Sequence, residues 1–344
     1  MAFGLAATVG RTAAAMADGR AAAAYAVEGS GVQGAAALGP IRGPEAAQWS
    51  LLGQAGLSFA AAVFVAVMAS HWAWSGVVGR KSRSCSEFGH GSLILFISRV
   101  LRRVAGLAGV TNDQNELVAR SAEYPKRQYL ACWHPHGLYV MTPLLFLSAG
   151  PRNSSSISYG FFTLVAGACF RFPLFRELLL LLNVRVADNQ IIDFLLGAGK
   201  SVFLSPGGIH EQLATDPKQE RVFIPPNAGF VRHAIRHGVP LVPTYNFGEN
   251  QLYDVPEWSR PISQWLYKRF RVGLPLGIGR WGLPFLPRKQ GISIRIGKVV
   301  EVGCPQAEAT DERVREVVLA YCQELRRLFE AHKDTDLPAD VAAR

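Results

Sequence analysis

The longest apolar stretch of this chain contains no charged residue. From Ala46 to Gly79 there is no Asp, Glu, Lys or Arg, and its centre at Leu57–Met68 is strongly apolar. Trp72 and Trp74 follow, as aromatic residues do at a membrane interface. Since about 20 apolar residues span a bilayer, the stretch predicts one membrane helix or a tight re-entrant hairpin. A buried core helix rarely avoids charge for so long.

Basic residues mark one end of this apolar stretch. Arg80, Lys81 and Arg83 follow it at once, whereas Arg42 is the nearest basic residue before it. Lys and Arg that flank a membrane segment tend to stay in the cytosol. The asymmetry therefore predicts that the C-terminal bulk of the chain lies on the cytosolic side.

A second apolar pattern follows at helical spacing. Its apolar residues form a stripe that consists of Leu93, Phe96, Ile97, Val100, Leu101, Val104 and Leu107. Arg99, Arg102 and Arg103 lie mostly off this stripe. A basic amphipathic helix resting on a bilayer has this pattern, and so does a helix of a domain core. Both interpretations stay open.

Beyond residue 125, short apolar runs alternate with helical patterns. Helical patterns occupy 190–196 and 229–237, and a C-terminal amphipathic helix at Asp311–His332 has Thr310 as its N-cap. The runs interpreted as strands are 129–133, 183–187, 201–204, 239–245 and 292–300. The alternation predicts an α/β fold with a mostly parallel or mixed sheet flanked by helices. The C-terminal helix is interpreted as a packing element without a functional role.

The composition indicates a membrane-attached globular domain. Hydrophobic residues make up 49% of the 344 positions, charged residues make up 18%, and the mean hydropathy is +0.14. This composition is too apolar for an ordinary soluble enzyme and too polar for a transporter with many membrane spans. The predicted organisation is a low-complexity disordered tail at 1–50, a membrane helix or hairpin at 51–79, and a globular domain at 80–344. An organelle transit peptide is the alternative for the tail.

The net charge of +10 indicates an anionic partner. Acidic lipid head groups and a phosphorylated cosubstrate fit this charge, whereas scattered basic residues and the lack of a recognisable module argue against nucleic acid. The five cysteines are far apart and form no CxxC pair, so neither a zinc cluster nor a disulfide framework is expected. A reducing compartment is the simpler interpretation.

The tetrapeptide His134-Pro135-His136-Gly137 follows the predicted strand 129–133. Histidine titrates near neutral pH, so it can accept a proton from a reacting hydroxyl and return it. The proline stiffens the backbone between the two imidazoles, and the glycine lets the chain turn or lets a substrate approach. The motif therefore predicts a site of proton transfer.

Three later segments carry further candidate residues. Pro206-Gly207-Gly208 follows the strand 201–204, and the N–H groups of consecutive glycines can cradle an oxyanion. Glu211, three residues further on, is placed to orient a histidine or to hold a cation. The other two segments are 229–232, where Arg232 is either a phosphate contact or a solvated helix charge, and 247–250, with Glu249 and Asn250.

In their order and spacing these motifs resemble the type-2 diacylglycerol acyltransferase family, which includes monoacylglycerol and wax-ester acyltransferases. The resemblance runs from about Asn115 to Val302. It rests on His134–Gly137, Pro206–Gly208 with Glu211, Gly229–Arg232 with Gly238 and Pro243, and Phe247–Asn250. Asn227 and Ala228 depart from the family pattern, which has a basic pair there.

The resemblance implies an integral membrane enzyme with a glycerolipid-acyltransferase-like fold, anchored near its N-terminus. Such an enzyme transfers a fatty acyl group from acyl-CoA, its cosubstrate, to a lipid alcohol, without a metal or another cofactor. His134 is the expected general base, His136 is the close alternative, and Glu211 is the expected supporting carboxylate. The expected substrate contacts are Pro135, Gly137, Pro206, Gly207, Gly208, Arg232, Glu249 and Asn250.

The predicted function is that of an acyl-CoA:diacylglycerol O-acyltransferase that makes triacylglycerol. The predicted location is the endoplasmic reticulum membrane with the catalytic domain in the cytosol, and a lipid droplet or the plastid envelope are the alternatives. Monoacylglycerol and long-chain alcohols are alternative acceptors, and a homo-oligomer is compatible with the sequence. From a different class, a catalytically dead lipid-binding or scaffold protein is the alternative, against which the intact histidines and Glu211 argue. A serine lipase is disfavoured because the chain has no Gly-x-Ser-x-Gly motif.

Overall fold

The computed structural model describes residues 44–84, 91–113, 127–139, 161–270, 273 and 276–343. The chain divides into two compact units, Met1–Val67 and Met68–Arg344. Of the predicted tail, residues 1–43 lie outside the described part. Residues 44–50 already belong to the helix that follows, so that helix begins earlier than the predicted boundary at residue 51.

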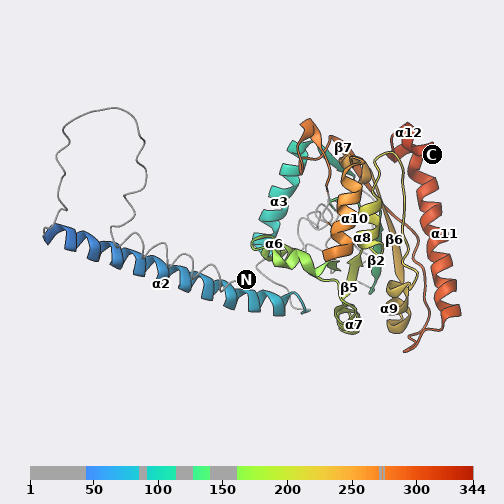
Figure 1. The fold of residues 1–344 in the computed structure, drawn as a ribbon. Helices are drawn as coiled ribbons and strands as arrows, with labels where there is room; N and C mark the ends of the chain where they lie inside the picture. Colours follow the sequence, from blue (N-terminus) through green and yellow to red (C-terminus); the bar gives the residue numbers. More distant parts are fainter. Residues whose placement is uncertain are drawn as a thin grey trace. The chain divides into compact units, whose positions relative to one another are not determined.

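Within the described part of the second unit, seven strands form one mixed sheet in the order β1-β7-β6-β2-β5-β3-β4 (Figure 1). Neighbouring strands are parallel except for the antiparallel pair β6 and β7. The strands are β1 Val110–Asp113, β2 Leu130–His134, β3 Phe161–Val165, β4 Val184–Val186, β5 Ser201–Leu204, β6 Leu241–Phe247 and β7 Gln290–Ile296. The predicted α/β fold with a mixed sheet is confirmed.

Two of these strands were not among the five predicted ones. β1 has the sequence Val-Thr-Asn-Asp, which shows no apolar run, and it pairs with β7 at one edge of the sheet. Apolar residues continue directly after β3, so the sequence does not indicate where this strand ends. Both strands are recognised only through their pairing with distant partners.

Helices cover both faces of the sheet and bury a separate core on each. One core joins the sheet to α7 (Asn189–Gly197), α9 (Gly229–His237), α11 (Asp311–Asp336) and α12 (Ala339–Ala342). The other joins it to α3 (Gly91–Ala108) and α6 (Phe175–Leu181). The remaining helices are α2 (Pro44–Lys81), α8 (Gly208–Ala214), α10 (Ser259–Phe270) and the short 3₁₀ turns η2 (Gly167–Arg171), η3 (Asn250–Leu252) and η4 (Arg280–Gly282).

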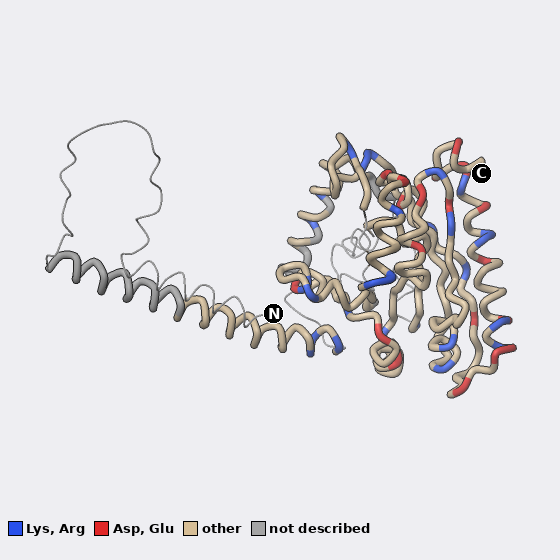
Figure 2. Tube along the Cα trace, viewed as in Figure 1, with Lys and Arg blue, Asp and Glu red and all other residues tan. Residues whose placement is uncertain are grey.

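The charge-free stretch forms the single helix α2. Because α2 runs without a break from Pro44 to Lys81, it contains no turn of a re-entrant hairpin. Its segment Ala62–Lys81 is long and apolar enough to cross a membrane, and little of it is buried in the protein. Basic side chains gather at the C-terminal end of α2, as Figure 2 shows. These findings favour the predicted membrane helix over the predicted hairpin.

The second apolar pattern forms α3, and its stripe divides between two environments. Ala105 is buried and Leu101 packs against the same core, as in a helix of the domain. Val104 and Leu107 are exposed, and so are Phe96 and Val100 further up the helix. The helix therefore contributes to the core and also presents an apolar face that the domain does not cover.

The C-terminal helix α11 begins where the sequence predicts. The Thr310 side chain accepts a hydrogen bond from the backbone N–H of Arg313 at 3.3 Å, which caps the helix. The predicted stripe is buried against the sheet through Val314, Val317, Tyr321, Leu325 and Leu328. One member of this stripe, Tyr321, turns out to do more than pack.

Candidate active site

Three of the predicted motifs meet at one edge of the sheet. β2 lies between β5 and β6 and is parallel to both, so the carboxyl ends of all three strands face the same way. His134–Gly137 follows β2, Ser205–Gly208 follows β5, and Phe247–Asn250 ends and follows β6. This edge is where open α/β sheets assemble their binding sites.

Glu211 holds the site together. Its carboxylate is buried and accepts four hydrogen bonds. Oε1 accepts from Nδ1 of His134 at 2.6 Å and from the backbone N–H of Phe223 at 2.9 Å. Oε2 accepts from the backbone N–H of His136 at 2.9 Å and from the Ser205 hydroxyl at 3.3 Å. The structure therefore brings together the three predicted catalytic residues.

The charge of Glu211 is maintained despite its burial. Burial by itself raises the pKa of a carboxyl group, but His134 and the N–H of Phe223 outweigh this effect, and the pKa of Glu211 lies below its ordinary value. A carboxylate that stays ionised can hold an imidazole in one tautomer and stabilise its protonated form.

His134 is completely buried and both of its ring nitrogens are occupied. Nδ1 faces Glu211, and Nε2 lies 3.1 Å from the hydroxyl of Tyr321. With Nδ1–H donating to the carboxylate, the Tyr321 hydroxyl donates to Nε2. His134 therefore has no lone pair directed at a substrate in this arrangement. The peptide bond between His134 and Pro135 is cis.

His136 is only partly buried and its environment differs. Its Nδ1 lies 2.9 Å from the carbonyl oxygen of Gly137, and since a carbonyl only accepts, Nδ1 carries the proton. The lone pair is then on Nε2, to which no described residue forms a hydrogen bond. Burial lowers the pKa of His136, which keeps the ring neutral near neutral pH.

At two glycines of the motifs, a neighbouring side chain lies too close to leave room for a Cβ. Gly137 has φ +68°, and a Cβ there would lie 2.5 Å from Cγ of Glu249. Gly207 is likewise pressed against Glu211, because its Cβ would lie 2.3 Å from Cδ of that residue. A Cβ on Gly208 would meet nothing within 4 Å, so Gly208 borders open space. Glu249 and Gly207 thus lie beside the cluster of His134, His136 and Glu211, and Gly208 follows directly.

Three site residues were missed by the sequence analysis. Ser205 and Phe223 reach Glu211, and Tyr321 reaches His134 from α11. The interpretation of α11 as packing alone is therefore incomplete. A signal existed for Tyr321, because a tyrosine on a fully apolar stripe needs a partner for its hydroxyl. The backbone N–H of Phe223 carries no such signal.

A second carboxylate, the partly buried Glu220, lies beside this cluster. It accepts hydrogen bonds from the Tyr245 hydroxyl at 2.8 Å, from Nδ2 of Asn250 at 3.1 Å and from Nε2 of Gln251 at 2.9 Å. Burial raises the pKa of Glu220, and nearby Glu211 adds to the rise. The predicted substrate residue Asn250 thus ties the loop containing Glu220 to the end of β6. The same loop contains Phe223, whose backbone N–H donates to Glu211.

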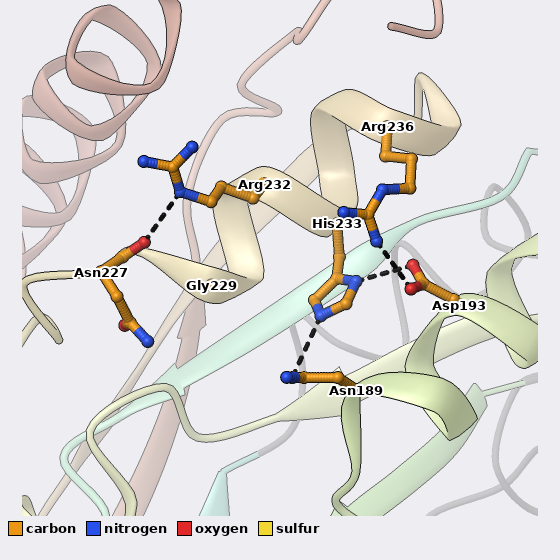
Figure 3. A pocket seen from close by; sticks show the side chains of 7 residues that line it. All are labelled: Asn189, Asp193, Asn227, Gly229, Arg232, His233 and Arg236. Atoms are coloured by element: carbon orange, nitrogen blue, oxygen red, sulfur yellow. Dashed lines mark hydrogen bonds and ion pairs between the residues drawn. The ribbon is translucent and has the colours of Figure 1, made fainter. Parts of the chain in front are cut away.

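Arg232 lies apart from the histidines, in a pocket between α7 and α9 (Figure 3). It donates to the carbonyl oxygens of Asn227 and Ala309 and forms an ion pair with Asp311 at 2.5 Å. The pocket has a volume of about 240 Å³. On its other side, the Asp193 carboxylate forms an ion pair with Arg236 and a hydrogen bond with His233. Among the described residues, no hydrogen bond or ion pair connects Arg232 to the histidine cluster. The guanidinium of Arg232 therefore binds groups of the protein itself, which is typical of a structural charge on a helix.

No group of three or more His, Cys, Asp or Glu side chains suited to a metal occurs among the described residues. The nitrogens of His134, which a metal would need, are bonded to Glu211 and Tyr321. The described cysteines Cys132, Cys169, Cys304 and Cys322 are free thiols.

Sequence comparison connects this site to known proteins. The sequence model of the diacylglycerol acyltransferase family matches residues 116–342. 2-Acylglycerol O-acyltransferase 1 of Bos taurus is 32% identical over 223 residues, which cover 61% of this chain and 66% of that protein. Diacylglycerol O-acyltransferase 2B of Umbelopsis ramanniana is 26% identical, with 61% and 65% covered. Acyl-CoA wax alcohol acyltransferase 2 of Homo sapiens is 30% identical, with 61% and 67% covered. The chain thus spans just under two thirds of the first two relatives.

Among solved structures, the 1-acyl-sn-glycerophosphate acyltransferase PlsC of Thermotoga maritima is similar at 16% identity and a TM-score of 0.38. The match covers 69% of this chain and 88% of that protein. At this level of similarity, no residue of the site is assigned from it.

Proposed function

Since the chain belongs to the diacylglycerol acyltransferase family, we propose that it is an acyl-CoA:diacylglycerol O-acyltransferase that makes triacylglycerol. The observation that carries the proposal is the cluster of His134, His136 and Glu211 at the carboxyl end of β2. It combines a partly exposed imidazole, a buried imidazole and an ionised carboxylate. This combination suits the deprotonation of an alcohol.

His136 is the proposed general base. Its Nε2 carries the lone pair and has no described partner, and its lowered pKa favours the neutral form. A neutral imidazole takes the proton of the acceptor hydroxyl while the oxygen attacks the thioester carbon, which contributes roughly 10²–10⁴-fold to the rate. As the carbon–sulfur bond breaks, the imidazolium returns the proton to the CoA sulfur. The C–O bond forms, the C–S bond breaks, and no acyl-enzyme is needed.

His134 and Glu211 are the proposed positioning pair. The Glu211 carboxylate bonds the backbone N–H of His136, so it fixes the residue that carries the base, and its negative charge stabilises the imidazolium. His134 in turn donates its Nδ1–H to the Glu211 carboxylate inside the protein. This assignment reverses the order in which the sequence ranked the two histidines. The tetrahedral oxyanion is proposed to meet backbone N–H groups at Gly207 and Gly208, since Gly208 faces open space.

The acceptor is the less constrained part of the proposal. Relatives named for 2-acylglycerol, diacylglycerol and wax alcohol acceptors are similarly close to this chain. Monoacylglycerol or a long-chain alcohol is therefore the second candidate acceptor. We further propose that acyl-CoA is the only cosubstrate and that the enzyme resides in the endoplasmic reticulum membrane with its catalytic domain in the cytosol. The apolar helix α2 and the basic residues at its end support this location.

The test is acyl transfer in membranes of yeast that lacks neutral-lipid synthesis. Membranes containing the full chain receive labelled acyl-CoA and equal amounts of diacylglycerol, monoacylglycerol and a long-chain alcohol. Triacylglycerol as the main product is expected, and the His136→Ala chain at an equal protein level serves as the control. A wax ester or diacylglycerol product selects the second candidate. No product from any acceptor, with the protein present and membrane-bound, overturns the proposal in favour of a lipid-binding scaffold.

A further inference from the structure

Large apolar side chains are exposed on two segments that follow each other in the chain. We call them the aromatic surface. Its members, 45% to 75% exposed, are Trp258, Ile262 and Trp265 at α10 and Trp281, Leu283 and Phe285 in the loop that contains η4. Single exposed apolar residues are common, but aromatic side chains grouped in this way mark a surface that binds something.

Three of the exposed apolar residues form one stripe at α10. Trp258, directly before the helix, and Ile262 and Trp265 within it are four and three residues apart, a spacing that places them on the same side of a helix, and Arg269 continues the stripe. Ser259 and Ser263 of α10 are buried, and the helix contacts α8 (Figure 1). The helix therefore turns two serines to the domain and Ile262 and Trp265 to the solvent.

The loop around η4 holds its aromatic residues in an unfavourable backbone conformation. Trp281 has φ +59° and Phe285 has φ +67°, a region that large side chains rarely adopt. The backbone of Gly279 donates to the carbonyl of Leu283, which closes the loop. Burial does not compensate Trp281, because 75% of it is exposed. Such strain at an exposed aromatic residue points to a function outside the fold.

Both segments lie next to the residues that follow the His134–Gly137 motif. The ring of Phe285 lies 5.3 Å from that of Tyr139, three residues after His136. Leu138 lines a small pocket together with Ser263 of α10. The aromatic surface thus flanks residues 138–139, directly beyond the proposed base.

The charge around the aromatic surface identifies its partner. Residues 259–300 contain no Asp or Glu, while Lys268, Arg269 and Arg280 accompany the aromatic residues. The guanidinium of Arg280 lies 4.2 Å from the centre of the Trp281 ring. Tryptophan with adjacent Arg and Lys is the combination that settles at a bilayer interface, where rings enter the head-group region and cations meet anionic phosphates.

We propose that the aromatic surface docks on an anionic lipid bilayer and holds residues 138–139, next to the proposed base, close to it. The docking is independent of α2 as an anchor. Its consequence, entry of the acceptor directly from the membrane, rests on the proposed function.

The test replaces Trp265 or Trp281 of the full chain by the photo-crosslinking amino acid p-benzoylphenylalanine. Leu319, which is 61% exposed on α11, is the control position. The proteins are reconstituted in phosphatidylcholine vesicles with or without phosphatidylserine, both labelled, and irradiated. Crosslinks to lipid from positions 265 and 281, stronger with phosphatidylserine, and none from position 319, are expected. A crosslinked dimer from positions 265 and 281 identifies a second copy as the partner and overturns the proposal, as does equal lipid labelling at all three positions.

A kinetic comparison tests the consequence for catalysis. The Trp265→Ser/Trp281→Ser chain should raise the apparent KM for vesicle-borne diacylglycerol on the order of tenfold, which corresponds to about 1.4 kcal/mol. It should leave the rate with detergent-dispersed diacylglycerol unchanged, and Leu319→Ser should change neither. Equal losses in both assays contradict a docking role. If the unmodified chain transfers no acyl group, the proposed function fails, yet the crosslinks still decide whether the surface docks.

Discussion

Nδ1 of His134 lies 2.6 Å from Oε1 of Glu211, and both side chains are essentially inaccessible to solvent. The two residues are 77 positions apart, His134 at the end of β2 and Glu211 in α8. The same carboxylate bonds the backbone of His136, so one buried group organises both histidines. Each of the following predictions tests one part of this arrangement.

The two histidines should respond differently to replacement by alanine. His136→Ala removes a partly exposed base, so kcat should fall roughly 10²–10⁴-fold with a normal protein level. His134→Ala takes away one buried partner from the Glu211 carboxylate and from the Tyr321 hydroxyl, which costs about 3–5 kcal/mol in the free energy of unfolding. Thermal unfolding and immunoblots measure stability, and initial rates measure kcat. The reverse outcome, a stable inactive His134→Ala and an active His136→Ala, would assign the base to His134.

The rate should depend on the protonation of His136. Burial lowers its pKa from the ordinary value of 6.5. The neutral form is the active one, so kcat/KM should decline as the pH falls and His136 becomes protonated, with the midpoint of the decline below pH 6.5. A pH profile measured on the unmodified chain tests this, and the residual activity of His136→Ala should lack the decline. A decline centred above pH 6.5 contradicts the prediction.

Tyr321→Phe should weaken the site without abolishing catalysis. The change removes one hydrogen bond to Nε2 of His134 and keeps the ring packing, so the unfolding free energy should fall by about 1 kcal/mol. Because Tyr321 acts through His134, kcat should change more than either KM. Val317→Ala, a deletion on the same buried stripe, is the control, since it lowers stability without touching His134. Equal kinetic effects of the two variants would make Tyr321 a packing residue only.

Glu220 should be needed to hold the loop that supplies Phe223. Glu220→Gln places an amide group among three donors, so at least one of them loses its acceptor, at a cost of roughly 1–3 kcal/mol. We expect a lower thermal unfolding temperature together with a lower kcat. Glu257→Gln, a change at an exposed residue, should alter neither quantity. A fully active Glu220→Gln chain would separate this network from catalysis.

Gly137→Ala should abolish activity, whereas Gly199→Ala should not. Both glycines have φ near +70°, so an alanine at either position costs about 1–2 kcal/mol in backbone strain. At Gly137 the new Cβ also collides with Glu249, while at Gly199 it meets nothing within 4 Å. Unfolding curves and initial rates of the two variants separate strain from collision. Similar behaviour of both variants would show that the Glu249 contact is dispensable.

Much of the fold follows from local sequence patterns. The charge-free helix, the five predicted strands and the capped helix α11 all appear where the apolar periodicity places them. Apolar periodicity indicates which side of a helix or strand is buried, and it can be read from residues close together in the sequence. The strand β1 escapes this signal because its stability comes from pairing with β7, which lies far away in the chain.

By itself the sequence determined which candidate residues come together, because motifs at strand ends must meet at one edge of a parallel sheet. Only the tertiary structure decided the surroundings of each of them. It buries His134 between Glu211 and Tyr321, leaves Nε2 of His136 without a described partner, and directs Arg232 to Asp311. The physical reason is that hydrogen-bond partners depend on which loops and helices meet across the sheet. Two histidines separated by one proline look alike in sequence, and long-range packing alone buries one of them between two partners and leaves the other partly exposed.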